Sequence, residues 1–118
     1  MKKILFVFAL TSLSYHLALA ENIKCIFTEP FVTTEYQVAQ NKLSLLGSAK
    51  NSKLIEGVSR QVLSPTKFQL VNQAGIILQI LSLTQNGSDG MSDRVYPYEA
   101  EDFSIQNGSS LFGGCFSN

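Results

Sequence analysis

The sequence predicts an all-β fold, a small antiparallel barrel or sandwich of seven or eight strands with one disulfide joining the terminal strands. Short runs of β-branched and aromatic residues recur between turn residues along the chain, as they do in sandwiches and small barrels. The two cysteines of the chain, Cys25 and Cys115, lie in the first and last of these runs. The chain also begins with an export signal, and exported proteins reach compartments where disulfides persist.

Residues 1–20 have the layout of a cleaved signal peptide. Two lysines precede an apolar run at 4–10, and Ala-Leu-Ala at 18–20 ends the segment, which is the order of a secretory leader. The apolar run is shorter than the roughly 20 residues that span a bilayer. We therefore expect a periplasmic or secreted protein with one domain over residues 21–118 and no membrane span after leader cleavage.

The first strands are predicted at residues 22–28, 31–38 and 42–46. The first run alternates in period two, and the second is rich in β-branched and aromatic residues, which favours strands. Pro30 predicts a bulge or break between these two strands. Pro97 lacks an N–H group, so we expect it at an edge, at a bulge or in a strand with only its start paired. The bond before Pro97 is also a candidate for the cis form.

Residues 52–63 fit two structures. Ile55, Val58 and Val62 stand at helical spacing, which predicts a helix. Gly57 costs such a helix about 1 kcal/mol, and valine also favours strands. Both interpretations stay open from the sequence.

The second half of the chain contains the remaining predicted strands. Residues 66–71 form one, and residues 75–84 are apolar on both faces, which indicates a central, well-covered strand. Two short strands follow at 95–100 and 102–105. After an Asn-Gly turn, residues 111–116 form the last strand and bring its cysteine toward the first.

One disulfide between Cys25 and Cys115 is the simplest use of the cysteines in an exported protein. It would close a loop of about 90 residues, worth roughly 4–5 kcal/mol in the chain-entropy model. Free or metal-bound thiols are the alternative, but residues 21–118 contain no histidine and no third cysteine to complete a metal site.

Composition excludes several function classes. The single histidine lies in the predicted leader, so the mature chain has no Ser-His-Asp or Cys-His catalysis and no histidine metal site. Seven basic residues against nine acidic ones remain, without the basic patch that a nucleic-acid partner requires. Catalysis by a carboxylate pair stays open in principle. We expect no enzyme activity, no cofactor and no metal.

Residues 86–103 hold the densest group of polar and aromatic side chains. One interpretation is structural: the Asn-Gly pair at 86–87 and the Asp-Gly pair at 89–90 form turns, and Asp93 and Arg94 brace neighbouring strands. A second is a calcium site built on two aspartates and loop carbonyls, although the spacing differs from that of an EF-hand.

The third interpretation is a surface that recognises a protein partner. Arginine and tyrosine are enriched among the residues that dominate interface energies. The candidate partner-binding residues are Asp89, Asp93, Arg94, Tyr96 and Tyr98.

Three segments together resemble a family of small exported bacterial proteins of unknown function. They are Thr-Glu-Pro-Phe at 28–31, Ser-Asp-Gly-Met-Ser-Asp-Arg-Val-Tyr-Pro-Tyr at 88–98 and Gly-Gly-Cys at 113–115. That family is described by a Glu-Pro-Phe start, an Asp-Gly-Met-Ser-Asp-x-x-Tyr-Pro loop and a Gly-Cys end. The resemblance covers both ends of the mature chain and little of its middle.

The chain departs from the resembled pattern at two positions. Val32 stands where the family pattern has an aromatic residue, and Ser88 stands where it has a cysteine before the Asp-Gly pair. In such relatives that cysteine would pair with the one near the end. Here Cys115 is left with Cys25, so the resemblance implies a loop less tightly anchored than in relatives.

More distantly, the size, export signal and terminal disulfide are similar to those of periplasmic inhibitors of c-type lysozyme, which are small antiparallel barrels. The resemblance implies an exported, non-catalytic binding protein of the cell envelope, and an inhibitor of a cell-wall hydrolase such as lysozyme is its most concrete form. A structural envelope protein without inhibitory activity and a carboxylate-based hydrolase are the alternatives, since a fold does not fix a function.

Overall fold

The computed structural model describes residues 22–47, 52–106 and 108–117. The predicted leader at residues 1–20 lies outside these ranges. Among the described residues, no helix is long and apolar enough to cross a membrane. The elements are β1 (Ile23–Thr28), β2 (Phe31–Gln37), the 3-10 turn η1 (Val38–Gln40), β3 (Lys42–Gly47), β4 (Ser52–Glu56), β5 (Ser59–Ser64), β6 (Lys67–Val71), β7 (Ile77–Gly87), β8 (Tyr96–Asp102) and β9 (Leu111–Ser117).

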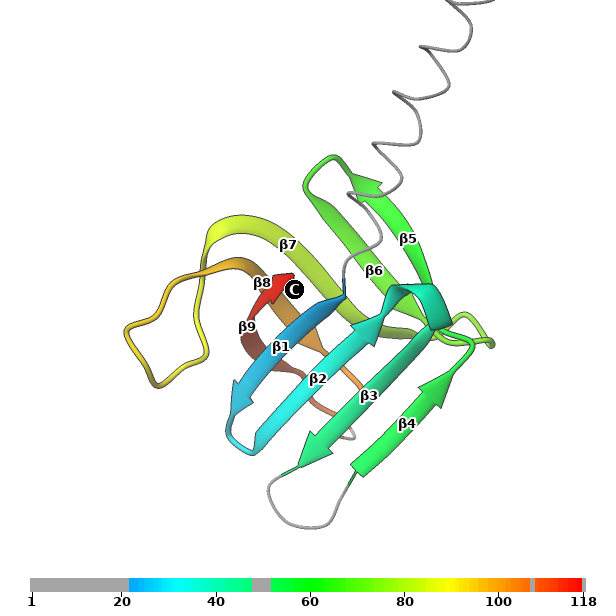
Figure 1. Cartoon of the computed structure of the whole chain (residues 1–118), viewed down its shortest axis with the longest axis horizontal. Coiled ribbons are helices and arrows are strands. Elements are labelled where there is room, and N and C mark those ends of the chain that lie inside the picture. Colours follow the sequence, from blue (N-terminus) through cyan, green and yellow to red (C-terminus); the bar gives the residue numbers. More distant parts are fainter. Residues whose placement is uncertain (1–21, 48–51, 107, 118) are drawn as a thin grey trace, which may run out of the picture.

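The nine described strands form one antiparallel sheet in the order β4-β3-β2-β1-β9-β8-β7-β6-β5. Figure 1 shows that this sheet curls on itself into a half-barrel. Neighbours in the sheet are consecutive in the chain except at the centre, where β1 pairs with β9. The prediction of an all-β antiparallel fold is confirmed, with nine strands in place of seven or eight.

The strand count differs because residues 52–63 are neither one helix nor one strand. They divide into β4 and most of β5, which lie at opposite edges of the sheet. Gly57 turns the chain between them with a φ of +71°, a conformation that favours glycine. Val58 follows with 0% exposure, and its N–H donates to the carbonyl of Asn41 at 2.9 Å. Val58 therefore belongs to the core, and its spacing from Ile55 does not reflect a helix.

The core fills the concave side of the curled sheet. Alternate residues of β1 are buried, and the same alternation carries Leu43 and Leu45 of β3 inward. From the other half of the sheet, Leu70 of β6 and Leu81 of β7 are fully buried in the same core. Period-two alternation with one face toward a common core produces this pattern.

The disulfide Cys25–Cys115 joins β1 to β9, as predicted. The two cysteines are directly opposite each other in the ladder, with Cα atoms 4.0 Å apart, and both side chains are buried. The covalent bond therefore crosses the one pairing in the sheet that joins distant parts of the chain.

The other predicted boundaries need small corrections. Pro30 lies in the two-residue connection between β1 and β2, so the predicted break is confirmed; its bond to Glu29 is cis, and the bond before Pro97 is not. Pro97 lies opposite the register shift between Leu83 and Gly87 of β7, which confirms the expected position at a bulge. The predicted strand at 102–105 is wrong, because β8 ends at Asp102 and the chain bends there.

Strand β7 is an internal strand of the sheet, third from the β5 edge and not at its centre, and it is one residue longer than the predicted 75–84. Leu78, Gln79 and Leu81 are buried in its first half, whereas Leu83 and the three residues after it are exposed. The prediction of a strand covered on both faces therefore holds only for this first half.

Candidate functional site

The loop of residues 88–95 is held together by the carboxylate of Asp89. Its Oδ1 accepts bonds from the backbone N–H groups of Met91 (2.9 Å) and Ser92 (2.8 Å). Its Oδ2 accepts bonds from the hydroxyls of Ser92 (2.6 Å) and Tyr96 (2.9 Å). The hydroxyl and N–H of Ser92 and the N–H of Met91 hold the pKa of Asp89 well below its ordinary value of 3.8. With Gly90 at a φ of +86°, the predicted Asp-Gly turn is confirmed.

Tyr96 fastens this loop to the convex face of the sheet. Its ring lies on Gly114 of β9, where a Cβ atom would come within 2.4 Å of the ring. A Cβ on neighbouring Gly113 would instead meet the buried ring of Phe27, so the two glycines face opposite sides. The Gly-Gly pair thus lets an aromatic ring approach the backbone on each side of β9.

Arg94 covers this contact from outside. Its guanidinium carbon lies 4.9 Å from the ring centre of Tyr96 and 5.0 Å from that of Phe116, within cation–π range. The two rings stack with centroids 6.2 Å apart. Arg94 therefore links β8 and β9, as the structural interpretation expected.

A bulge in β7 explains why the loop reaches the convex face. The β7–β8 register shifts between Leu83 and Gly87, and Gln85 has a φ of +62°. A Cβ on Gly87 would lie 2.0 Å from the carbonyl oxygen of Tyr98, so only glycine fits. The prediction of a turn at the Asn-Gly pair 86–87 is therefore wrong. These two residues form the end of a strand after a bulge.

The loop is also tied to the end of β1. The hydroxyl of Thr28 donates to the carbonyl of Asp89 at 2.8 Å, and a Cβ on Gly90 would come within 2.9 Å of that hydroxyl. The three segments on which the family resemblance rests thus meet in one place, through Thr28, Asp89, Tyr96 and Gly114. They form one structural unit at one end of the half-barrel.

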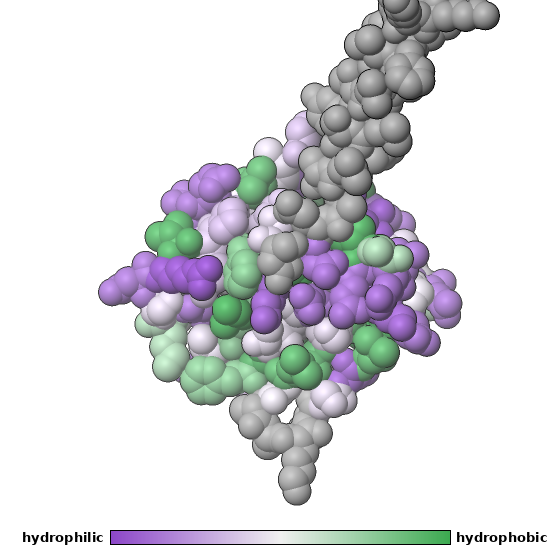
Figure 2. Space-filling model, viewed as in Figure 1, coloured by the Kyte–Doolittle hydropathy of each residue, from purple (hydrophilic) through white to green (hydrophobic). Residues whose placement is uncertain are grey.

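Exposed apolar side chains border this unit. Phe31 is 54% exposed, Met91 69% and Phe112 61%. Phe31 is opposite Thr28 in the ladder, and Phe112 lines a surface hollow together with Thr28 and Gly90. Figure 2 shows apolar surface in the region where Figure 1 places the β1–β2 connection. Contiguous exposed apolar surface often marks an interaction site.

No family model, no curated protein and no solved structure matches this chain.

The five candidate partner-binding residues divide into three groups. Asp89 and Tyr96 are buried and hold the loop, whereas Asp93 and Arg94 are exposed on it. Tyr98 lies apart from them on the concave face, with its ring edge-on to that of Phe68 at 6.3 Å. The apolar residues Phe31, Met91 and Phe112 were not among the candidates, although the first two belong to the resembled motifs.

The calcium interpretation is not supported by the arrangement of donors. Both oxygens of Asp89 already accept two hydrogen bonds each, so N–H and O–H groups point at the positions a cation would need. Within residues 22–47, 52–106 and 108–117, no group of three or more histidine, cysteine or acidic side chains is placed to hold a metal.

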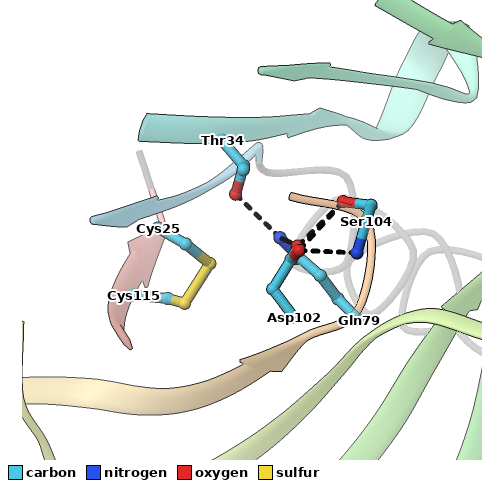
Figure 3. Close-up of a disulfide and its surroundings, with 6 residues drawn as sticks. All are labelled: Cys25, Thr34, Gln79, Asp102, Ser104 and Cys115. Carbon is cyan, nitrogen blue, oxygen red and sulfur yellow. Dashed lines mark hydrogen bonds between the residues drawn. A yellow bond between two sulfur atoms is a disulfide. The ribbon is translucent and has the colours of Figure 1, made fainter. Parts of the chain in front are cut away.

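A second polar cluster lies in the core beside the disulfide (Figure 3). The amide nitrogen of Gln79 on β7 donates to Oδ2 of Asp102 at 2.7 Å and to the hydroxyl of Thr34 on β2 at 2.8 Å. Asp102 also accepts bonds from the N–H groups of Ser104 and Ile105 and from the Ser104 hydroxyl. Burial raises the pKa of Asp102 against these hydrogen bonds, which lower it. Since Asp102 is fully buried, the cluster joins strands across the core.

We expect the Asp89→Asn variant to lose stability in a pH-dependent way. The pKa of Asp89 is lowered in the folded state, so its contribution is present above the ordinary 3.8 and is lost as the pH falls below it. The difference in unfolding free energy between wild type and Asp89→Asn should therefore be widest at neutral pH and narrow in acid. Urea unfolding at several values between about pH 3 and pH 7 measures it.

Asp93→Asn is the matched control, because it removes an exposed carboxylate of the same loop. Its unfolding free energy at neutral pH should differ from wild type by less than about 0.5 kcal/mol. A constant difference between wild type and Asp89→Asn at every pH would contradict the assignment of Asp89 as the ionised anchor of the loop.

Proposed function

We propose that the chain is an exported, non-catalytic binding protein of the cell envelope, periplasmic or secreted, that recognises a protein partner. An inhibitor of a cell-wall hydrolase such as lysozyme is the most concrete form of this proposal. The binding surface is the exposed side of the 88–95 loop together with Phe31 and Phe112, which we name the loop-end surface.

The observation that carries the proposal is the contrast between the inner and outer sides of the loop. Inward, the carboxylate of Asp89 and the ring of Tyr96 fix the backbone through hydrogen bonds and packing on Gly114. Outward, Met91 is exposed, as are Phe31 and Phe112 near the loop, and Phe112 lines the same surface hollow as Gly90 of the loop. A loop that is already ordered gives up little conformational entropy on binding, and apolar anchors gain by burial in a partner.

The charged residues suit the rim of such a contact. Asp93 and Arg94 are exposed beside Met91, and rim charges direct association and orientation more than they add affinity. If the partner is a hydrolase, inhibition would be by occlusion. The apolar anchors of this protein would enter the partner's substrate groove, while Asp93 and Arg94 would contact polar groups at the edge of that groove. Asp89 and Tyr96 would act through the shape of the loop.

The test is hydrolysis of cell-wall suspensions by c-, g- and i-type lysozymes, titrated with the disulfide-bonded protein. We expect stoichiometric inhibition of one type. Met91→Ser should weaken it by about tenfold or more with unchanged melting temperature. Asp93→Ala should weaken it less, chiefly by slowing association. Lys53→Ala is the control, because Lys53 is exposed on the edge strand β4, and it should inhibit like the wild type.

Two results would replace the proposal by its alternatives. No inhibition of any type at micromolar protein, together with lower melting temperatures of the loop variants, would favour a structural envelope protein. Hydrolysis of the cell wall by the protein itself, abolished by one acid-to-amide change, would favour a carboxylate-based hydrolase.

A further inference from the structure

A pocket opens on the concave face of the half-barrel, on the side of the sheet away from the loop-end surface. Its volume is about 260 Å³. Strands from both halves of the sheet line it, since Ile23 of β1 and Leu83 of β7 contribute together with β5 and β6. The pocket therefore lies inside the curl, between the β5–β6 edge of the sheet and the ends of β1 and β9 at its centre.

The walls of the pocket are apolar and aromatic. Ile23, Leu83 and Val62 line it, and the rings of Phe68 and Tyr98 meet edge to face at 77°. Sites for drug-sized ligands have volumes of roughly 300–1,000 Å³ and walls of this kind with a few polar groups. The slightly smaller volume here suits a ligand of a few carbon atoms with one polar end.

Two cations stand at this pocket. Arg60 is half-buried and its guanidinium carbon lies 5.4 Å from the ring centre of Phe68, while Lys67 lines the exposed rim. Among the residues that the structure describes, the ion pair present is Lys42–Glu56, and no carboxylate pairs with Arg60 or Lys67. The charge of Arg60 acts on the interior as well, since it lowers the pKa of the buried Tyr36 hydroxyl against the larger, opposite effect of burial.

A partly desolvated guanidinium without an anion is a favourable place for one. A guanidinium that has lost part of its hydration is stabilised by an anion that replaces the lost water. Arginine forms its strongest hydrogen bonds with carboxylate and similar planar anions. The apolar walls next to Arg60 select a ligand whose acidic group is attached to an apolar body.

We propose that the concave pocket binds a small amphipathic carboxylate, with Arg60 holding the acid and Phe68 and Tyr98 contacting the apolar body. The proposal is independent of the loop-end surface, because the two lie on opposite faces of the sheet. It also gives a role to Tyr98, which the loop does not use.

Octanoate and 1-octanol are matched probes for this site, since they share the alkyl chain and differ in the charge. Titration calorimetry on the disulfide-bonded protein should show octanoate binding to the wild type and weaker or no binding of octanol. Arg60→Gln should weaken octanoate binding by about tenfold. Lys24→Gln, which removes a cation from the neighbouring position of β1 outside the pocket lining, should leave it unchanged.

Equal affinity of the wild type for octanoate and octanol would overturn the proposal. So would equal octanoate affinity of wild type and Arg60→Gln, or no octanoate binding to the wild type at millimolar concentration. If Arg60→Gln does not fold, the octanoate affinity of Lys67→Gln tests whether positive charge at the pocket contributes to binding. Lys67 is exposed, so its replacement should leave the fold intact. Octanoate binding unaffected by Lys67→Gln, with no preference over octanol in the wild type, would reject the site.

Discussion

Replacing both cysteines, as Cys25→Ala with Cys115→Ala, will lower the melting temperature by roughly 15–30 °C. The disulfide links residues 90 positions apart, and a loop of that length restricts the unfolded chain by roughly 4–5 kcal/mol in the chain-entropy model. The bond also crosses the β1–β9 ladder, the one pairing between the two ends of the chain. Reduction of the wild type should give the same loss.

Thermal unfolding with and without reductant measures this effect. The wild type should melt at a lower temperature after reduction, whereas the double alanine variant should not respond to reductant. If the reduced wild type melted within a few degrees of the oxidised protein, the β1–β9 ladder would be stable without the covalent bond, and the entropic account would fail.

Asp102→Ala should be the most destabilising single change in the polar cluster. It leaves the N–H groups of Ser104 and Ile105 without their acceptor and removes a partner of Gln79. Unsatisfied buried donors cost about 1–3 kcal/mol each, so the loss should be roughly 2–4 kcal/mol, reduced where water reaches the bend. Urea unfolding at neutral pH measures it, with Asp93→Ala as the exposed control.

Asp102→Asn adds a pH test with the opposite sign to that of Asp89. Burial raises the pKa of Asp102 in the folded state, so its contribution is full below the ordinary 3.8 and is lost as the pH rises through the raised value. The difference in unfolding free energy between wild type and Asp102→Asn should therefore narrow as the pH rises. A difference that widens would mean that the hydrogen bonds from the four donor groups outweigh burial and that the pKa of Asp102 is lowered.

Most strands could be predicted from the sequence, because period-two alternation over a single core leaves a clear pattern. Strands β1, β2, β3 and β6 begin and end within one residue of their predicted bounds. The failure at 52–63 has a tertiary cause: Val58 is buried between two edge strands at the end of the barrel. Local spacing does not contain that information.

The candidate site was harder to predict because a bulge changes which face a residue occupies. Tyr96 and Tyr98 are two residues apart, so alternation alone puts them on one face. Beside the register shift between Leu83 and Gly87, Tyr96 instead lies on the convex side and Tyr98 in the concave pocket. The Asp-Gly turn was predictable because Asp89 acts through neighbours within a few residues.

The pairing of β1 with β9 has a further consequence once the disulfide is counted as part of the chain. Between Cys25 and Cys115 the backbone and the bond together form a closed ring, and eight connections between strands lie on it. A protease that cuts any one of these connections opens the ring but detaches no strand. The oxidised protein can thus be cut once between these cysteines and remain a single covalently connected molecule.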